Sequence, residues 1–315
     1  MRRLWMLLLA ATTLVACRTP DPERPGTLHR DQMLVHDDVE RTYHWYAPAT
    51  DDTPRPLVLS LHGGGGTIDN HLGVDGAQWP WQVWLDVADE DGVHVVVPQG
   101  VNQQWNDCRA ECERCGNEDD VGFLVALVDA IAAQANIDRN RVYVQGESNG
   151  GFMTQRLLQE VPEVFAAGGV TIALMPADNA CDVQNVPRSV MYQLGTDDAL
   201  VPYDGGSENA QIVVQSKEES VAYWTNLNQC TTPPSTSIYD DLDVDDGSIV
   251  TREDHRCEAT GTEVSVLTMD GAGHVPPSID APVGGVWELL AGRQNHDVEA
   301  VRELWAFFAD KALTP

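Results

Sequence analysis

The most chemically suggestive stretch of the chain is a serine enclosed by glycines. Residues 146–150 read G-E-S-N-G; the strand-like run 141–145 precedes them, and apolar residues at helical spacing follow. In such a turn the serine adopts a strained backbone conformation, and its hydroxyl projects at the helix N-terminus, where developing negative charge is stabilised. We therefore predict that Ser148 is a nucleophile.

A serine nucleophile needs a base, because a free hydroxyl is a poor nucleophile at neutral pH. His274 lies in a glycine-flanked loop directly after the strand-like run 263–269, and Asp198 follows the run 190–194. Serine, acid and histidine, each at a strand end, is the chain order of an α/β-hydrolase triad. His274 would accept the serine proton and Asp198 would orient the imidazole, with Asp197 as the alternative acid.

A second glycine-rich segment follows the predicted buried strand 56–61. It reads H-G-G-G-G from His62 to Gly66, and H-G-G-G after a strand is the pattern of an oxyanion loop. A Walker phosphate loop is excluded because no Gly-Lys-Ser/Thr follows. We expect the backbone N–H groups of Gly64 and Asn149 to form the oxyanion hole, and His62 to have a structural role in the loop.

The elements that must position these residues alternate between strand and helix. Such alternation predicts an α/β fold of the α/β-hydrolase type, with a mostly parallel central sheet and helices on both faces. A hairpin over 32–35 and 41–47 is expected at one sheet edge. Tryptophans 79, 81 and 84 are expected in the core rather than in a substrate cleft. Further strands are predicted at 93–97 and 168–174, and further helices at 119–135, 216–228 and 297–309.

The net charge of the chain limits the classes of partner that it can bind. The 315 residues carry 49 acidic and 19 basic side chains, a formal net charge of −30. A chain without a basic face does not bind nucleic acid, and its charge does not favour adhesion to anionic lipid. We expect a soluble acidic surface, a monomer, and neither metal nor cofactor.

The first residues read as a leader rather than as part of the fold. A basic start and a short apolar run lead to L-V-A-C, ending at Cys17, the pattern of a bacterial lipoprotein signal. We therefore predict a signal over 1–17 with lipidation of Cys17, a Pro-rich tether over 18–27, and one catalytic domain over 28–315. The protein would be extracellular or periplasmic and would touch a membrane only through the lipid anchor. An ordinary secretory signal is the alternative.

Six cysteines remain after Cys17, an even number in a chain predicted to be exported, so disulfides are expected. Cys230 and Cys257 bracket an acidic insertion and are the pair that we expect to be bonded. The pairing of the other four stays open. These are Cys108, Cys112, Cys115 and Cys181.

The chain resembles secreted esterases grouped with polyhydroxybutyrate depolymerases and feruloyl esterases. The resemblance extends over nearly all of the chain after the tether. It implies that Asp198 rather than Asp197 is the acid, and that Cys230 is bonded to Cys257. The matching segments are 61–64, 120–124, 137–151, 195–203, 224–230 and 271–274.

The resemblance also implies an activity: hydrolysis of carboxylic esters through an acyl-serine. Expected substrates are feruloyl or acetyl esters of plant polysaccharide, or short hydroxyalkanoate polyesters. Because Glu147 lies beside the nucleophile, we expect neutral esters. The chain departs from the family pattern after His274, where V-P-P replaces a Trp-Pro step, and in its cysteine-rich loop 108–115. Alternatives are a serine peptidase of the same fold and a catalytically silent surface protein that binds carbohydrate.

Overall fold

The computed structural model describes residues 24–49, 52–110, 112, 114–207 and 212–314. The predicted signal with Cys17 lies outside these residues, as do positions 18–23 of the tether. The rest of the predicted tether belongs to the folded part: Arg24 Nη1 lies 2.8 Å from Asp86 Oδ1, and Thr27 begins the first strand. The described part of the chain therefore begins a few residues before residue 28, the predicted start of the catalytic domain.

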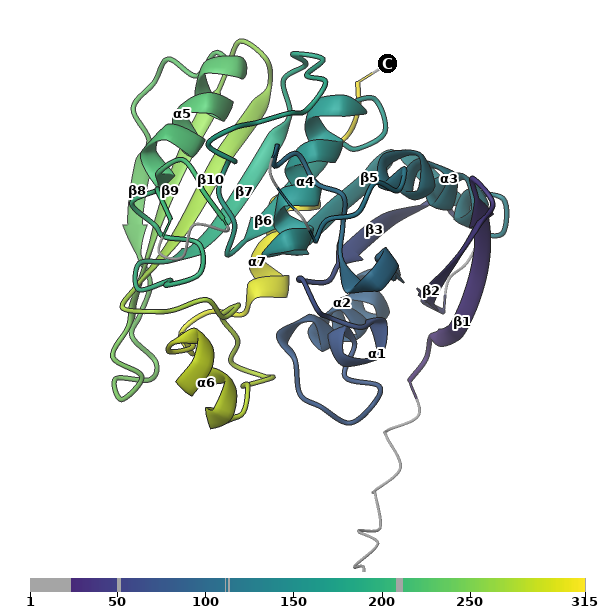
Figure 1. The fold of residues 1–315 in the computed structure, drawn as a ribbon, viewed down its shortest axis with the longest axis horizontal. Coiled ribbons are helices and arrows are strands. Elements are labelled where there is room, and N and C mark those ends of the chain that lie inside the picture. The colour runs from purple at the N-terminus through teal and green to yellow at the C-terminus, as the bar shows by residue number, and fades with distance from the viewer. Residues whose placement is uncertain (1–23, 50–51, 111, 113, 208–211, 315) are drawn as a thin grey trace, which may run out of the picture.

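Ten strands form a single sheet in the order β1-β2-β4-β3-β5-β6-β7-β10-β9-β8 (Figure 1). The strands from β4 to β10 pair in parallel, and antiparallel strands extend the sheet at both edges. The predicted hairpin is confirmed as β1 and β2, whereas β8 and β9 were not predicted. The strands are β1 Thr27–His36, β2 Val39–Ala47, β3 Arg55–Leu61, β4 His94–Pro98, β5 Ile137–Glu147, β6 Ala167–Thr171, β7 Ser189–Gly195, β8 Ser235–Ile238, β9 Ile249–Cys257 and β10 Thr262–Asp270.

Helices cover both faces of the sheet and bury separate apolar clusters against it. Side chains of α3, α4 and α5 pack into one cluster, and those of α2 and α7 into the other. Within the described ranges, every helix is too short or too polar to span a bilayer. The α-helices are α1 Ile68–His71, α2 Trp84–Asp91, α3 Asp120–Ala132, α4 Asn149–Glu160, α5 Lys217–Leu227, α6 Gly285–Ala291 and α7 Ala300–Phe308, with 3₁₀ turns at Pro80–Val83 and Val101–Gln103.

The parallel centre explains why the middle strands read as apolar runs. Strand β4 is buried along its whole length, as expected for a strand with helices on both sides. The fold is therefore the predicted α/β-hydrolase arrangement, in which functional residues gather at the carboxyl ends of the parallel strands.

Three disulfides cross-link the described chain. Cys230 is bonded to Cys257, as predicted, and joins the end of α5 to the end of β9. The open pairing is settled as Cys108–Cys181 and Cys112–Cys115. The first of these two ties the loop after β4 to the loop after β6, and the second closes a short loop near the sheet's carboxyl edge.

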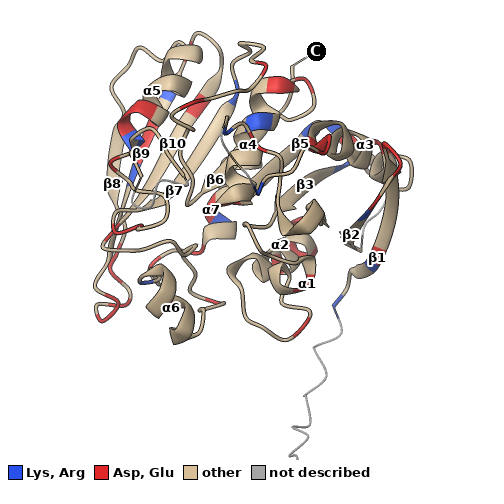
Figure 2. Cartoon of the chain, viewed as in Figure 1, with Lys and Arg blue, Asp and Glu red and all other residues tan. Residues whose placement is uncertain are grey.

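Acidic side chains are distributed over many elements rather than gathered on one face (Figure 2). Most described arginines form ion pairs with acidic side chains. One such pair is buried: Arg41 Nη2 lies 2.6 Å from Asp120 Oδ1. Such a distribution matches a solvated acidic surface better than a single anionic binding site.

Candidate active site

The turn between β5 and α4 has the predicted strained geometry. Ser148 has φ +50° and ψ −118°, a conformation that non-glycine residues rarely adopt. The flanking glycines are required by packing: a Cβ at Gly146 would overlap the carbonyl oxygen of Gly150, and one at Gly150 would overlap that of Leu61. The Ser148 N–H donates to the Thr171 carbonyl, 2.9 Å away, so the turn is fixed and the hydroxyl lines a cavity.

Asp198 and His274 meet at the ends of β7 and β10. Asp198 Oδ2 lies 2.6 Å from His274 Nδ1, while its Oδ1 accepts the backbone N–H groups of Leu200 and Val201 at 2.8 Å. The alternative acid Asp197 is exposed and makes no contact with the imidazole among the described residues. With Nδ1 bound to the carboxylate, His274 Nε2 is the nitrogen left for chemistry.

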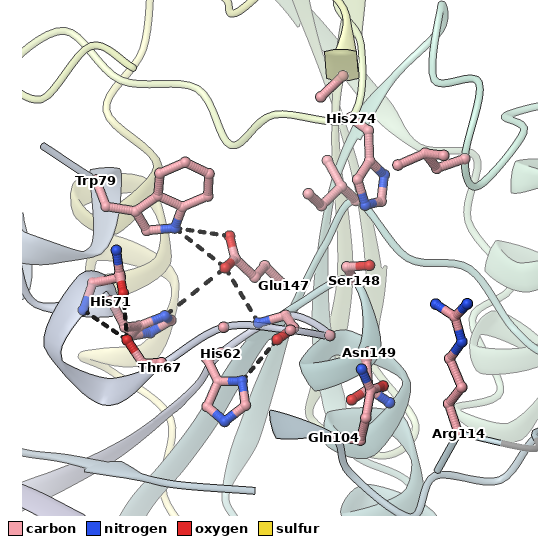
Figure 3. Close-up of a pocket in the computed structure, with 18 of the residues that line it drawn as sticks. His62, Thr67, His71, Trp79, Gln104, Arg114, Glu147, Ser148, Asn149 and His274 are labelled. Carbon is pink, nitrogen blue, oxygen red and sulfur yellow. Dashed lines mark hydrogen bonds and ion pairs between the residues drawn. The ribbon is translucent and has the colours of Figure 1, made fainter. Parts of the chain in front are cut away.

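Ser148 and His274 line the same cavity of about 1150 Å³, and the imidazole faces the serine (Figure 3). Among the described residues, no hydrogen bond joins Ser148 Oγ to the imidazole. Catalytic hydrogen bonds of this kind are often long before substrate binds. The structure thus brings together the three residues that the sequence analysis selected.

The glycine loop after β3 leaves one backbone N–H for a ligand. The N–H groups of Gly63, Gly65 and Gly66 donate to Glu147, Gln103 and the Gly63 carbonyl, respectively. Neither Gly64 nor Asn149 has its backbone N–H hydrogen-bonded within the described chain, and both residues line the cavity. These are the two donors predicted for an oxyanion hole.

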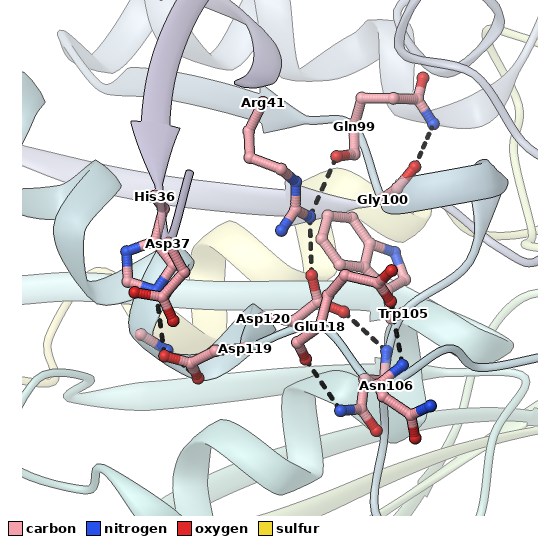
Figure 4. A network of polar contacts seen from close by, with 12 residues as sticks. His36, Asp37, Arg41, Gln99, Gly100, Trp105, Asn106, Glu118, Asp119 and Asp120 are labelled. Carbon is pink, nitrogen blue, oxygen red and sulfur yellow. Dashed lines mark hydrogen bonds and ion pairs between the residues drawn. The ribbon is translucent and has the colours of Figure 1, made fainter. Parts of the chain in front are cut away.

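The Asn149 side chain locks the start of α4 to the loop that follows β4. Its Oδ1 accepts the Trp105 N–H at 2.7 Å, and its Nδ2 donates to the Trp105 carbonyl and to Asp107 Oδ2. Beneath the loop, the buried Asp120 holds both Arg41 and the Asn106 N–H (Figure 4). The loop that faces the nucleophile is therefore fixed by buried polar contacts on two sides.

His62 has the predicted structural role. Its Nδ1 lies 2.7 Å from the Gly63 carbonyl and its Nε2 accepts the Gly100 N–H at 3.0 Å, which requires a neutral ring protonated at Nδ1. Burial lowers the pKa of His62 to about 4, so the ring stays neutral at physiological pH.

Glu147 is the residue whose position the sequence did not reveal. Its carboxylate is buried and accepts N–H groups from Gly63 at 3.2 Å, Trp79 at 3.2 Å and Trp81 at 2.8 Å (Figure 3). Burial raises the pKa of the carboxyl group. The three donors lie 66 to 84 residues before Glu147 in the chain, so the sequence alone gave no signal that they converge on it.

Two walls of different chemistry flank Ser148. On one side Trp79 packs edge-to-face against Trp287 of α6, with ring centroids 5.4 Å apart. Trp81 and Trp84 are buried in the core, as predicted, but the prediction was wrong for Trp79, which lines the cavity. On the other side Arg109 and Arg114 belong to the cysteine-rich loop. We refer to these as the aromatic wall (Trp79 and Trp287) and the disulfide wall (Arg109, Ala110, Cys112, Arg114 and Cys115).

Comparison with known proteins supports the fold and the resemblance. A model of the prolyl oligopeptidase family matches residues 100–177, which include the serine turn. The chain is 32% identical over 211 residues to a poly(3-hydroxybutyrate) depolymerase of Ralstonia pickettii, covering 59% of this chain and 42% of that protein. It is 27% identical over 208 residues to a probable feruloyl esterase C of Aspergillus niger, covering 65% and 72%.

Among solved structures, an acetyl xylan esterase from Aspergillus awamori aligns with a TM-score of 0.52 at 15% identity, covering 84% of this chain and 98% of that one. A thermostable esterase aligns with a TM-score of 0.53 at 17% identity, covering 92% and 64%. These likenesses confirm the α/β-hydrolase fold. The sequence matches confirm the resemblance to depolymerases and feruloyl esterases, although the chain spans less than half of the depolymerase's length.

Proposed function

We propose that the protein is a serine hydrolase of carboxylic esters that works through an acyl-Ser148 intermediate. The observation that carries the proposal is the convergence in one cavity of a strained serine and a histidine bound to Asp198. The sequence relatives named as depolymerase and feruloyl esterase support ester chemistry in particular.

In the first half-reaction, Ser148 Oγ attacks the ester carbonyl carbon while His274 Nε2 takes the hydroxyl proton. The carbonyl oxygen becomes an oxyanion that accepts hydrogen bonds from the Gly64 and Asn149 N–H groups, each worth about 3 kcal/mol of transition-state stabilisation. The tetrahedral intermediate then collapses. Its C–O bond to the alcohol breaks, and the alcohol leaves with the proton from His274.

In the second half-reaction, water attacks the acyl carbon as His274 Nε2 removes its proton. The carboxylic acid departs and Ser148 Oγ regains the proton. Asp198 remains ionised throughout, since its hydrogen bond with Nδ1 stabilises the imidazolium formed in each half-reaction.

For substrates, we propose feruloyl or acetyl esters of plant polysaccharide, or short hydroxyalkanoate polyesters. The aromatic wall supports an aromatic or apolar group beside the nucleophile. We also propose that Cys17 carries the lipid anchor of an exported protein, on the L-V-A-C pattern. Incorporation of radiolabelled palmitate, abolished by Cys17→Ser, tests the anchor.

The activity is tested with p-nitrophenyl acetate. The purified protein should hydrolyse it, and Ser148→Ala should reduce kcat at least about a thousandfold with an unchanged melting temperature. Absence of turnover in the unaltered protein would overturn the proposal and favour a non-catalytic binding protein.

A serine peptidase is the second candidate, favoured by the prolyl oligopeptidase match over residues 100–177. Ester and amide substrates with the same acyl group separate the two. An esterase cleaves N-acetyl-proline p-nitrophenyl ester and leaves N-acetyl-proline p-nitroanilide intact, whereas a peptidase cleaves both.

A further inference from the structure

We propose that Arg114 determines substrate specificity by binding a carboxylate of the ester, so that the preferred substrates are anionic. This inference rests on the proposed ester-hydrolase function and deepens it. Arg114 lines the same cavity as Ser148 and His274, and Figure 3 shows its guanidinium on the side of Ser148 opposite Trp79.

The guanidinium of Arg114 is exposed and has no partner among the residues that the structure describes. Of the arginines that the structure describes, only Arg114 and Arg256 have a side chain without a hydrogen bond, ion pair or aromatic contact. Arg256 lies on β9 and does not line the cavity. In a chain with 49 acidic residues, a cation left unpaired beside the nucleophile is therefore unusual.

The neighbouring cation does not compete for the same role. Arg109 is bound to Asp107, with Nη2 and Oδ2 2.7 Å apart, and its guanidinium lies over the Phe152 ring at 4.5 Å. The charge of Arg109 is therefore neutralised by Asp107. Arg114 is thus the guanidinium of the disulfide wall that can accept a new anion.

Among the described residues that line the cavity, Glu147 is the single carboxylate, and it does not cancel this charge. Glu147 is buried and engaged by the N–H groups of Gly63, Trp79 and Trp81. It faces the aromatic wall, across the serine from Arg114 (Figure 3). The expectation of neutral esters, drawn from the position of Glu147 next to the nucleophile, therefore loses its physical basis.

The backbone on which Arg114 stands is held covalently. Arg114 lies between Cys112 and Cys115, which are bonded to each other. A short closed loop of this kind limits where the guanidinium can move. A guanidinium in such a position binds a carboxylate through two parallel N–H···O bonds.

Two kinds of ester would place a carboxylate there. The acyl half carries it in a half-ester of a dicarboxylic acid. The alcohol half carries it in the last ester bond of a hydroxyalkanoate oligomer or in an acylated uronic acid. The shared chemistry is a carboxylate a few bonds from the scissile carbonyl.

Matched ester pairs test the inference. On the acyl side, mono-p-nitrophenyl adipate is compared with p-nitrophenyl hexanoate; on the alcohol side, 4-acetoxybenzoate with its methyl ester. The ratio of kcat/KM for the anionic over the neutral ester is measured at low ionic strength for the unaltered protein, Arg114→Gln and Arg256→Gln, after subtraction of the Ser148→Ala rate.

Arg114→Gln should lower this ratio about three- to tenfold in at least one pair, with kcat/KM for the neutral ester within about twofold. Arg256→Gln removes an equally unpaired charge outside the cavity and should leave both ratios unchanged. Added salt should reduce the ratio in the unaltered protein.

The outcomes separate the two proposals. Neutral esters hydrolysed normally, with both ratios unaffected by Arg114→Gln, would overturn the role of Arg114 alone. An equal fall of the ratios in Arg256→Gln would also overturn it, because the effect would then be one of net charge. No hydrolysis of any of the four esters by the unaltered protein would overturn the esterase proposal itself.

Discussion

The two walls of the cavity are held in place by different means. Hydrogen bonds fix the aromatic wall: Trp79 donates to the buried Glu147, which also accepts the Gly63 N–H of the glycine loop. The disulfide wall is cross-linked covalently by the disulfides Cys112–Cys115 and Cys108–Cys181. One wall therefore shares its anchor with the oxyanion loop and the other does not. Changes in the shared anchor Glu147 should alter the chemical step, and changes in the disulfide wall should alter the choice of substrate.

The largest expected effect comes from removing the shared anchor. Glu147→Ala leaves three N–H donors without this acceptor, two of them on the buried residues Gly63 and Trp81, and frees the loop that carries Gly64. We expect kcat to fall about a hundredfold, comparable to the loss of one oxyanion donor, with a smaller change in KM. Glu147→Gln keeps one acceptor oxygen and should recover part of kcat. A purely structural role would instead lower the melting temperature with kcat unchanged in the folded fraction.

Acid should destabilise the folded protein through two buried histidines, His62 and His94. Burial lowers the pKa of His62 and of His94 to about 4, so between pH 6.5 and 4 the unfolded chain binds protons that the folded chain excludes. The free energy of unfolding should fall as pH drops through this window, by up to about 3 kcal/mol for each histidine. Urea titrations between pH 4 and 7.5 measure the slope, which should become shallower in His62→Asn. An unchanged slope in that variant would contradict the assignment of His62.

Breaking the disulfide wall should cost stability and selectivity but not chemistry. The double variant Cys112→Ala, Cys115→Ala removes a short loop closure, worth about 2 kcal/mol in the chain-entropy account. The preference for anionic over neutral esters should shrink as in Arg114→Gln, while kcat for p-nitrophenyl acetate stays within about twofold. A large fall in kcat would show that the two walls are coupled.

The smallest effect is expected at the rim of the aromatic wall. Trp287 is 53% exposed, lines the cavity and packs edge-to-face against Trp79. Trp287→Ala should raise KM about two- to fivefold for feruloyl esters and leave KM for acetate esters unchanged, since an aromatic contact contributes roughly 0.5–1.5 kcal/mol. Val286→Ala, on the same helix and also exposed, serves as the matched control. Equal shifts for both ester classes would mean that Trp287 does not contact the acyl ring.

Local sequence patterns predicted the central part of the fold and the residues of the candidate site. The serine turn, the glycine loop, Asp198 and His274 each follow a run that was predicted to be a strand, so their places at one edge of the sheet could be predicted. The segment 120–124 carries part of the family resemblance, and in the structure its first residue, Asp120, forms a buried pair with Arg41. The helix predicted over 297–309 forms as α7, where Phe307 is buried and Trp305 is only partly so.

What escaped prediction depends on contacts between distant segments. The anchor at Glu147 requires residues 63, 79, 81 and 147 to meet, and no periodicity encodes that meeting. The short exposed strand β8 has little apolar patterning, because neither of its faces is buried. The pairing of four crowded cysteines depends on which loops the fold brings together, so composition left it open.

Helix α6 indicates which positions of this fold can be mutated to change its specificity. None of its side chains is buried, and Val286, Leu289 and Leu290 are more than two-thirds exposed. Its last residue nevertheless holds the histidine loop, because the Ala291 carbonyl accepts the His274 N–H at 2.6 Å. The six positions 285–290 can thus be varied at little cost to folding, and one of them, Trp287, lines the cavity. Directed evolution toward new acyl groups should begin there, with Ala291 and Gly292 kept constant.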